Sequence, residues 1–131
     1  MLRVGELRKK RILVVEDDPV GQFVVVDALT AHGYDVSLAR TGPEGIAMAH
    51  ATQPDLILCD VLLPQKSGFE VCFEVKRSAR TRDVPVVFMS AVCRDSYAEA
   101  YAAIDLRAEA YFVKPFRMGA LVSRIRGLLT T

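Results

Sequence analysis

The sequence predicts an α/β domain in which a parallel β-sheet carries helices on both faces. Short apolar runs typical of buried strands alternate five times with longer runs that have helical features, and no long linker separates them. Glycine and proline residues punctuate the segments between these runs. The 131 residues, of which 51% are hydrophobic, suffice for one domain with a single continuous core.

The first strand is predicted at residues 11–15 and the first helix at residues 19–32. Three consecutive valines within the second range disfavour a helix, but the residues at its ends favour one. Asp18 can cap the amino end, Pro19 suits the first helical position, and Gly33 can end the helix.

The later elements follow in the same alternating order. The remaining strands are predicted at residues 35–39, 56–59, 86–89 and about 110–113. Two further helices are expected to begin at a proline or glycine, from Pro43 to near His50 and from Gly68 to about Ser78. A fourth should start at the capping-box spacing of residues 96–99, and the last shows one buried stripe formed by Leu121, Ile125 and Leu128.

Composition excludes several classes of protein. The net charge of +1 gives no indication of a nucleic-acid or membrane partner, so neither is expected. No apolar stretch approaches the roughly 18 residues that span a bilayer, and the amino terminus lacks the apolar core of a signal peptide, which predicts a cytoplasmic protein. Cys59, Cys72 and Cys93 form no CxxC pair and are expected to be reduced thiols.

Polar side chains follow four of the predicted strands. They are Glu16, Asp17 and Asp18 after the first strand, Asp60 after the third, Ser90 after the fourth and Lys114 after the fifth. If these strands are parallel and adjacent, their carboxyl ends meet at one crevice, which is where open α/β sheets bind ligands. The sequence therefore predicts a metal and phosphate site there.

Three carboxylates in this crevice would need a cation. Two unit charges about 4 Å apart repel by about 4 kcal/mol at an effective dielectric constant of 20. Magnesium accepts a few carboxylates, a carbonyl and waters, and it bridges to phosphate oxygens, whereas calcium takes more protein ligands. Helix capping alone is the alternative for Asp17 and Asp18. Asp60 favours the metal site, because an acid that ends a buried run needs a compensating partner.

Lys114 and Ser90 each have a simpler interpretation as a surface lysine and a strand-ending serine. Pro115 favours a shaped turn instead, because an X-Pro bond can be cis, and such a turn would aim the ammonium across the crevice at Asp60. With an acid and an ammonium nearby, the Ser90 hydroxyl becomes a candidate donor to a phosphoryl oxygen.

Other catalytic patterns are missing or weak. His32 and His50 lie near predicted helix ends, where contact with a helix carboxyl terminus is expected rather than catalysis. The sequence contains no Gly-rich P-loop, GxSxG or HExxH motif.

A resemblance to a known family rests on four segments. These are residues 12–19 (ILVVEDDP), residues 55–64 (DLILCDVLLP) with Gly68, Ser90 with Ala91, and residues 111–116 (YFVKPF). They resemble the receiver domain of bacterial two-component response regulators from about Lys10 to Leu129. The resemblance implies a flavodoxin-like (βα)5 fold with strand order 2-1-3-4-5, with residues 1–9 as an amino-terminal extension and residues 10–131 as a single receiver domain.

The resemblance also implies a role for each crevice residue. Asp60 would accept a phosphoryl group from a histidine kinase or a histidine phosphotransfer protein. Glu16 and Asp17 would hold Mg²⁺ together with Asp60 and the backbone carbonyl of Leu62. Lys114 would pair with the phosphoryl group and take part in catalysis.

Signalling would follow from a conformational switch. By resemblance, Ser90 would hydrogen-bond the phosphoryl group, and Tyr111 would be the switch aromatic that turns inward with it; a half-buried aromatic on an edge strand is the alternative for Tyr111. The fourth helix, fifth strand and fifth helix would then bind a downstream effector or a second copy of the chain. Such a domain is not an enzyme in the ordinary sense, since it catalyses only its own phosphorylation and autodephosphorylation.

Two other functions fit part of the pattern. Phosphatases of the haloacid dehalogenase type also use an aspartyl nucleophile and magnesium, but they usually carry a second acid two residues after the nucleophile, where this chain has Leu62. A receiver-like scaffold that binds partners without phosphorylation is the second-ranked alternative. Loss of the acceptor or of the acidic pair is its usual sign, and both are present here.

Overall fold

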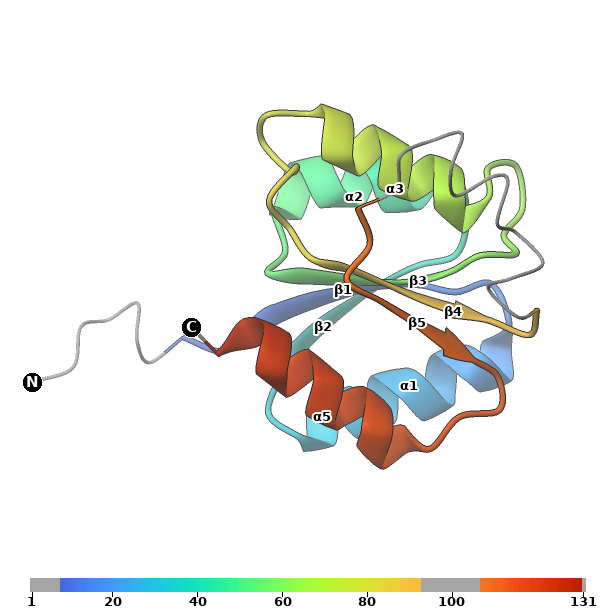
Figure 1. Ribbon diagram of the computed structural model, residues 1–131, viewed down its shortest axis with the longest axis vertical. Coiled ribbons are helices and arrows are strands. Elements are labelled where there is room, and N and C mark those ends of the chain that lie inside the picture. Colours follow the sequence, from blue (N-terminus) through green and yellow to red (C-terminus); the bar gives the residue numbers. More distant parts are fainter. Residues whose placement is uncertain (1–7, 93–106, 131) are drawn as a thin grey trace, which may run out of the picture.

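The sheet has five parallel strands in the order β2-β1-β3-β4-β5, which confirms the predicted flavodoxin-like topology (Figure 1). The computed structural model describes residues 8–92 and 107–130. The strands are β1 (Arg11–Val15), β2 (Asp35–Ala39), β3 (Leu56–Asp60), β4 (Val86–Ser90) and β5 (Ala110–Val113). Every neighbouring pair is parallel, so the carboxyl ends of all five strands lie along one edge.

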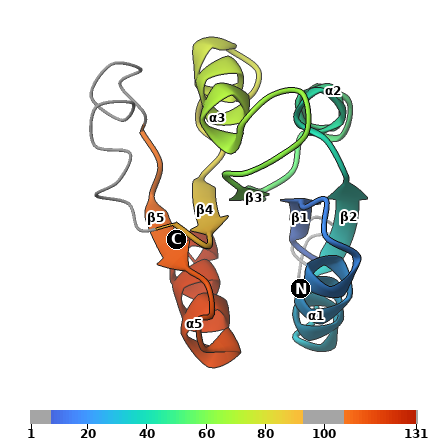
Figure 2. The ribbon, with the colours of Figure 1, turned by 90° about the vertical axis from the view of Figure 1, so that its right-hand side faces the viewer.

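Helices cover both faces of the sheet, as Figures 1 and 2 show. The described helices are α1 (Pro19–Ala31), α2 (Gly42–Thr52), α3 (Gly68–Arg77) and α5 (Met118–Leu129). Side chains alternate along β1, so Ile12 and Val14 pack under α1 and α5, while Leu13 and Val15 face α2 and α3. Because both faces are covered, the strands read in sequence as continuous apolar runs.

The residues that were predicted to bound α1 do so. The Asp18 carboxylate accepts a hydrogen bond from the Gly21 N–H at 3.0 Å, and Pro19 is the first helical residue. Gly33 follows the helix with a φ of +91°, a conformation that costs glycine little. His32 lies at the carboxyl end of α1, as predicted, with its Nδ1 2.8 Å from the Ala28 carbonyl oxygen.

One helix boundary was predicted too short. The structure ends α2 at Thr52, two residues beyond His50, because Gln53 adopts the left-handed conformation that stops the helix. Glutamine rarely adopts that conformation, so the residue type at position 53 did not predict the end of α2. The predicted fourth helix lies outside the described residues.

Both described cysteines, Cys59 and Cys72, are free, as predicted, and both are buried. Burial raises the pKa of the Cys72 thiol to about 12 and that of Cys59 well above its ordinary value, so both stay protonated.

Within the described residues, no helix has the length and apolar character needed to cross a membrane.

Gly68 allows α3 to pack directly on the backbone that follows β3. Its N–H donates to the Val61 carbonyl oxygen at 2.8 Å. A Cβ at this position would overlap the Asp60 carbonyl oxygen and lie 2.9 Å from the Val61 Cα. The start of α3 therefore has no room for a side chain, and the backbone after Asp60 is held against the helix.

Gly68→Ala is expected to lower the free energy of unfolding by about 1–3 kcal/mol, because the added methyl group overpacks a backbone contact. Urea unfolding measures the change. Gly127→Ala is the matched control, because Gly127 is exposed in α5 and a Cβ there meets nothing within 4 Å. It should raise stability by about 0.5–1 kcal/mol. Equal unfolding midpoints for Gly68→Ala and the wild type would contradict the close packing.

Candidate functional site

Three carboxylates meet at the carboxyl edge of the sheet, as predicted. Ligand oxygens of Glu16, Asp17 and Asp60 lie within 4.8 Å of one another. Glu16 and Asp17 directly follow β1, and Asp60 is the last residue of the adjacent β3. Glu16 and Asp60 are only 1% and 5% exposed, whereas Asp17 is open to solvent. The site is therefore a buried acidic pair with one accessible acid at its mouth.

Lys114 reaches this site from the end of β5. Its Nζ donates to Asp60 Oδ2 at 2.6 Å and to Glu16 Oε2 at 2.9 Å. The Lys114–Pro115 bond is cis, and the Lys114 N–H donates to the Ser90 carbonyl oxygen at 2.7 Å. The ammonium thus spans the end of β4 and partly neutralises both buried acids.

The remaining oxygen of Asp60 also has a partner. The Leu62 N–H donates to Asp60 Oδ1 at 3.1 Å, and the Leu62 side chain is 54% exposed at the rim of the site. A metal-binding role for the Leu62 carbonyl stays a prediction.

Electrostatics at the site favour binding of a cation. Burial, then a hydrogen bond with Asp60 and repulsion from its charge, raise the pKa of Glu16 to about 7, although the Lys114 ammonium acts in the opposite direction. Burial alone would lower the pKa of Lys114, but its hydrogen bonds to Asp60 and Glu16 outweigh this and place the pKa above its ordinary value. Among the described residues, one ammonium is bonded to two of the three clustered acids, and a divalent cation would relieve the remaining negative charge.

Ser90 and Tyr111 are connected through one residue. Ser90 is fully buried at the end of β4, and its Oγ accepts a hydrogen bond from the Val92 N–H at 3.1 Å. The Tyr111 hydroxyl donates to the Val92 carbonyl oxygen at 2.6 Å, and its ring packs edge-to-face on Phe88 with centroids 6.1 Å apart. Any movement of Ser90 that displaces Val92 therefore alters the contacts of Tyr111.

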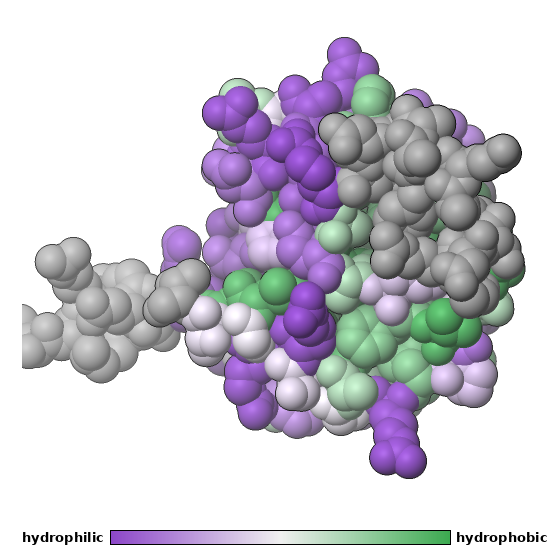
Figure 3. Space-filling view, in the orientation of Figure 1, coloured by the Kyte–Doolittle hydropathy of each residue, from purple (hydrophilic) through white to green (hydrophobic). Residues whose placement is uncertain are grey.

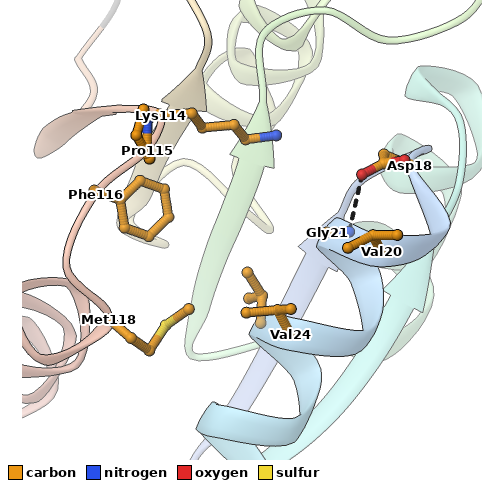
Figure 4. Close-up of a pocket in the computed structure, with 9 residues that line it drawn as sticks. Asp18, Val20, Gly21, Val24, Lys114, Pro115, Phe116 and Met118 are labelled. Atoms are coloured by element: carbon orange, nitrogen blue, oxygen red, sulfur yellow. Dashed lines mark hydrogen bonds between the residues drawn. The ribbon is translucent and has the colours of Figure 1, made fainter.

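An apolar hollow of about 280 Å³ borders the site. Figure 4 shows Phe116 and Met118 facing Val24 of α1 across it, with Lys114 at its upper margin. Apolar surface gathers at the end of the molecule where β5 leads into α5 and α1 begins (Figure 3). Val20 and Phe23 on α1 add exposed apolar side chains there, 70% and 72% accessible. A partner that approaches Asp60 from this side would meet an apolar surface.

Two contacts of the site were missed by sequence analysis. The Gln22 side chain donates to the Glu16 carbonyl oxygen at 2.7 Å, and Val92 joins Ser90 to Tyr111. Neither residue carries a sequence signal, because one acts through a contact to backbone and the other through its own backbone.

Comparison with known proteins is consistent with this geometry. The model of the response regulator receiver domain matches residues 12–126. The chain is 39% identical over 119 residues to the DNA-binding dual master transcriptional regulator RpaA of Synechocystis sp., covering 91% of this chain and 48% of that protein. It is 37% identical to response regulator MprA of Mycobacterium tuberculosis, covering 91% and 50%. The chain thus spans about half the length of these relatives.

Solved structures of similar fold include two that contain magnesium. The receiver domain of the sensor histidine kinase PA1611 from Pseudomonas aeruginosa, with a magnesium ion coordinated in its active-site cleft, has a TM-score of 0.85 and 27% identity, covering 95% of this chain and all of that one. Response regulator TrrA of Thermotoga maritima, in complex with Mg²⁺ and BeF, has a TM-score of 0.80 and 28% identity, covering 92% and 99%.

The family match, the relatives and the fold agree over most of the chain. Receiver domains are signalling domains, and the acidic cluster lies at the edge where the resemblance placed it. This chain belongs to the family of response regulator receiver domains.

Proposed function

We propose that this receiver domain accepts a phosphoryl group on Asp60 in a magnesium-dependent reaction and thereby switches its contacts with a partner. One observation carries the proposal: Asp60 is a buried carboxylate bonded to the Lys114 ammonium, with two further acids close to its oxygens. Burial of charge is costly, so an acidic pair buried beside an ammonium at the edge of the sheet is better explained by function than by stability.

The donor set fits magnesium. All three side chains offer oxygen, the ligand that Mg²⁺ prefers, and the exposed Asp17 leaves the mouth of the site open to water and phosphate oxygens. Glu16, Asp17 and Asp60 would hold the ion together with the backbone carbonyl of Leu62. The bound ion would offset charge on the transferring phosphoryl oxygens.

The chain's own groups would supply the rest of the reaction. An Asp60 carboxylate oxygen attacks phosphorus, the bond from phosphorus to the donor nitrogen breaks, and an acyl phosphate forms. Lys114 offsets charge on the phosphoryl oxygens, and the Ser90 hydroxyl donates a hydrogen bond to one of them. Attack of water on phosphorus then breaks its bond to the Asp60 oxygen, releases inorganic phosphate and restores the carboxylate, so the domain would catalyse both its phosphorylation and its autodephosphorylation.

Phosphorylation would be transmitted through Val92. When Ser90 turns its hydroxyl toward the phosphoryl group, its bond to the Val92 N–H weakens, and the Tyr111 bond to the Val92 carbonyl is altered. This differential contact biases two conformations of the face formed by β5 and α5. A downstream effector or a second copy of the chain would bind that face.

The phosphodonor would be a histidine kinase or a histidine phosphotransfer protein in the cytoplasm. Such a protein must bring its phosphohistidine to Asp60, beside the apolar hollow between α1 and the loop after β5.

We place the domain boundaries at residues 10–131, with residues 1–9 as an extension.

Asp60→Asn is expected to abolish phosphorylation, because the amide is not a nucleophile for phosphorus. The wild type incubated with acetyl phosphate and Mg²⁺ should gain one phosphoryl group by intact mass, and omission of Mg²⁺ should prevent the gain. Asp27→Asn, an exposed acid on α1 away from the crevice, is the control and should be phosphorylated like the wild type. A phosphoryl group retained by Asp60→Asn would place the acceptor at another residue.

Asp17→Asn is expected to weaken Mg²⁺ binding at least about tenfold, because a direct ligand contributes no less than the outer-shell partners whose loss typically has that effect. Without Mg²⁺ its melting temperature should stay the same or rise, since one repelling charge is gone. Thermal melts with and without Mg²⁺ measure both effects.

Asp18→Asn is the matched control for this prediction. It removes one charge at the neighbouring position, and asparagine caps a helix as well as aspartate does, so the bond from the Gly21 N–H can persist. Its Mg²⁺-induced rise in melting temperature should equal that of the wild type. If Asp17→Asn and Asp18→Asn reduced the Mg²⁺-induced rise in melting temperature equally, the result would show only a general effect of charge.

A further inference from the structure

We propose that Gln22 is a positioning residue that holds Asp17 in the orientation required for metal binding, an inference that rests on the proposed function. Asp17 lies between two peptide groups, and a side chain fixes each of them. The Gln22 Nε2 donates to the Glu16 carbonyl oxygen at 2.7 Å. On the other side, the Asp18 N–H donates to Glu16 Oε1 at 3.1 Å.

The Gln22 contact begins where the sheet stops holding the backbone. The Glu16 N–H still bonds in the manner of a strand, to the Ala39 carbonyl oxygen at 3.0 Å. The next peptide group, between Glu16 and Asp17, lies beyond the last residue of β1, and its carbonyl is taken by the Gln22 amide. The side chain from α1 therefore continues the restraint that the sheet supplies up to Glu16.

Gln22 is itself anchored to the same loop. Its backbone N–H donates to the Asp18 carbonyl oxygen at 2.9 Å, and the Asp18 carboxylate caps the first turn of α1 through Gly21. The half-buried Gln22 side chain thus connects the first turn of α1 to the start of the loop that joins β1 to α1. Gly21 leaves room for Glu16 against the first turn of α1, because a Cβ at this position would lie 3.2 Å from the Glu16 Cδ.

The restraint affects Asp17 more than Glu16 or Asp60. Both buried acids are also held by Lys114, whereas Asp17 is exposed and depends on the backbone on either side of it for its direction. Rotation of the Glu16–Asp17 peptide group would swing the Asp17 side chain away from the other two carboxylates. Loss of the Gln22 donor should therefore weaken metal binding through Asp17.

A merely structural role for Gln22 predicts something different. A lost amide–carbonyl bond would reduce the free energy of unfolding by the same amount in any background, and that loss would not depend on Asp17. The positioning role predicts that the effect of Gln22 on Mg²⁺ binding disappears once Asp17 is no longer a ligand. A double-mutant cycle separates the two.

The first experiment titrates Mg²⁺ into the metal-free protein by calorimetry. Gln22→Met removes the donor but keeps an unbranched side chain of similar length and helix propensity. We expect the dissociation constant to rise about tenfold in the wild-type background, as for loss of an outer-shell partner, and less than about twofold when Asp17→Asn is already present. Thr30→Met, at an exposed position of the same helix, is the control and should change nothing.

The second readout needs no metal. In Gln22→Met, hydrogen exchange of the Asp18 amide should become faster, because the peptide group before Asp17 can rotate and disturb the Asp18 contact with Glu16. The Val25 amide, in the buried middle of α1, should exchange at the wild-type rate. Faster exchange at both amides would indicate fraying of the helix and overturn the positioning role.

Phosphorylation kinetics complete the test. With acetyl phosphate, Gln22→Met should need about tenfold more Mg²⁺ for half-maximal rate and reach the wild-type maximal rate at saturating Mg²⁺. The inference would be overturned if Gln22→Met left the dissociation constant for Mg²⁺ unchanged, or if it weakened Mg²⁺ binding equally in the Asp17→Asn background. The wild type could bind Mg²⁺, and the double-mutant cycle could give the expected coupling, although the protein is never phosphorylated. In that case the proposed function fails and the positioning role of Gln22 stands.

Discussion

The ammonium of Lys114, bonded to two buried acids from two other strands, is the interaction on which the site depends. Glu16 and Asp60 lose nearly all contact with water, and burial of such charges is unfavourable unless they are paired. The pairing requires β1, β3 and β5 to end at the same edge although β4 separates the last two. The backbone bond from Lys114 to Ser90 sets how far the ammonium reaches, so the sheet fixes the electrostatics of the crevice.

The same edge connects the crevice to two surfaces. On one side, Val92 receives a bond from Tyr111 and donates one to Ser90, which links the buried end of β4 to β5. On the other side, the apolar hollow beside Lys114 is formed by α1 and the loop after β5. The charged centre therefore has two neighbours at this edge, the hydrogen bonds through Val92 and the apolar hollow that Lys114 borders.

Much of the site was predictable because each charged side chain ends a recognisable apolar run. Glu16, Asp60 and Lys114 follow strands whose burial is evident from their residues, and parallel strands bring such positions together. Gln22 was not predictable, since its amide acts on a backbone carbonyl six residues earlier, and glutamine in a helix is ordinarily solvated. The end of α2 was missed for a similar reason, because Gln53 takes a left-handed conformation that its type does not favour.

Three features could be predicted from the residues alone: the alternation of strands and helices, the residues at the strand ends and the resemblance to receiver domains. They were predictable because burial on both faces requires apolar runs, and helix ends require particular capping residues. The folded chain was needed to show which oxygen bonds to which donor, how Val92 connects Ser90 to Tyr111, and how Gln22 contacts the loop of Asp17. Those contacts depend on distances between elements far apart in the chain, and residue type alone does not set such distances.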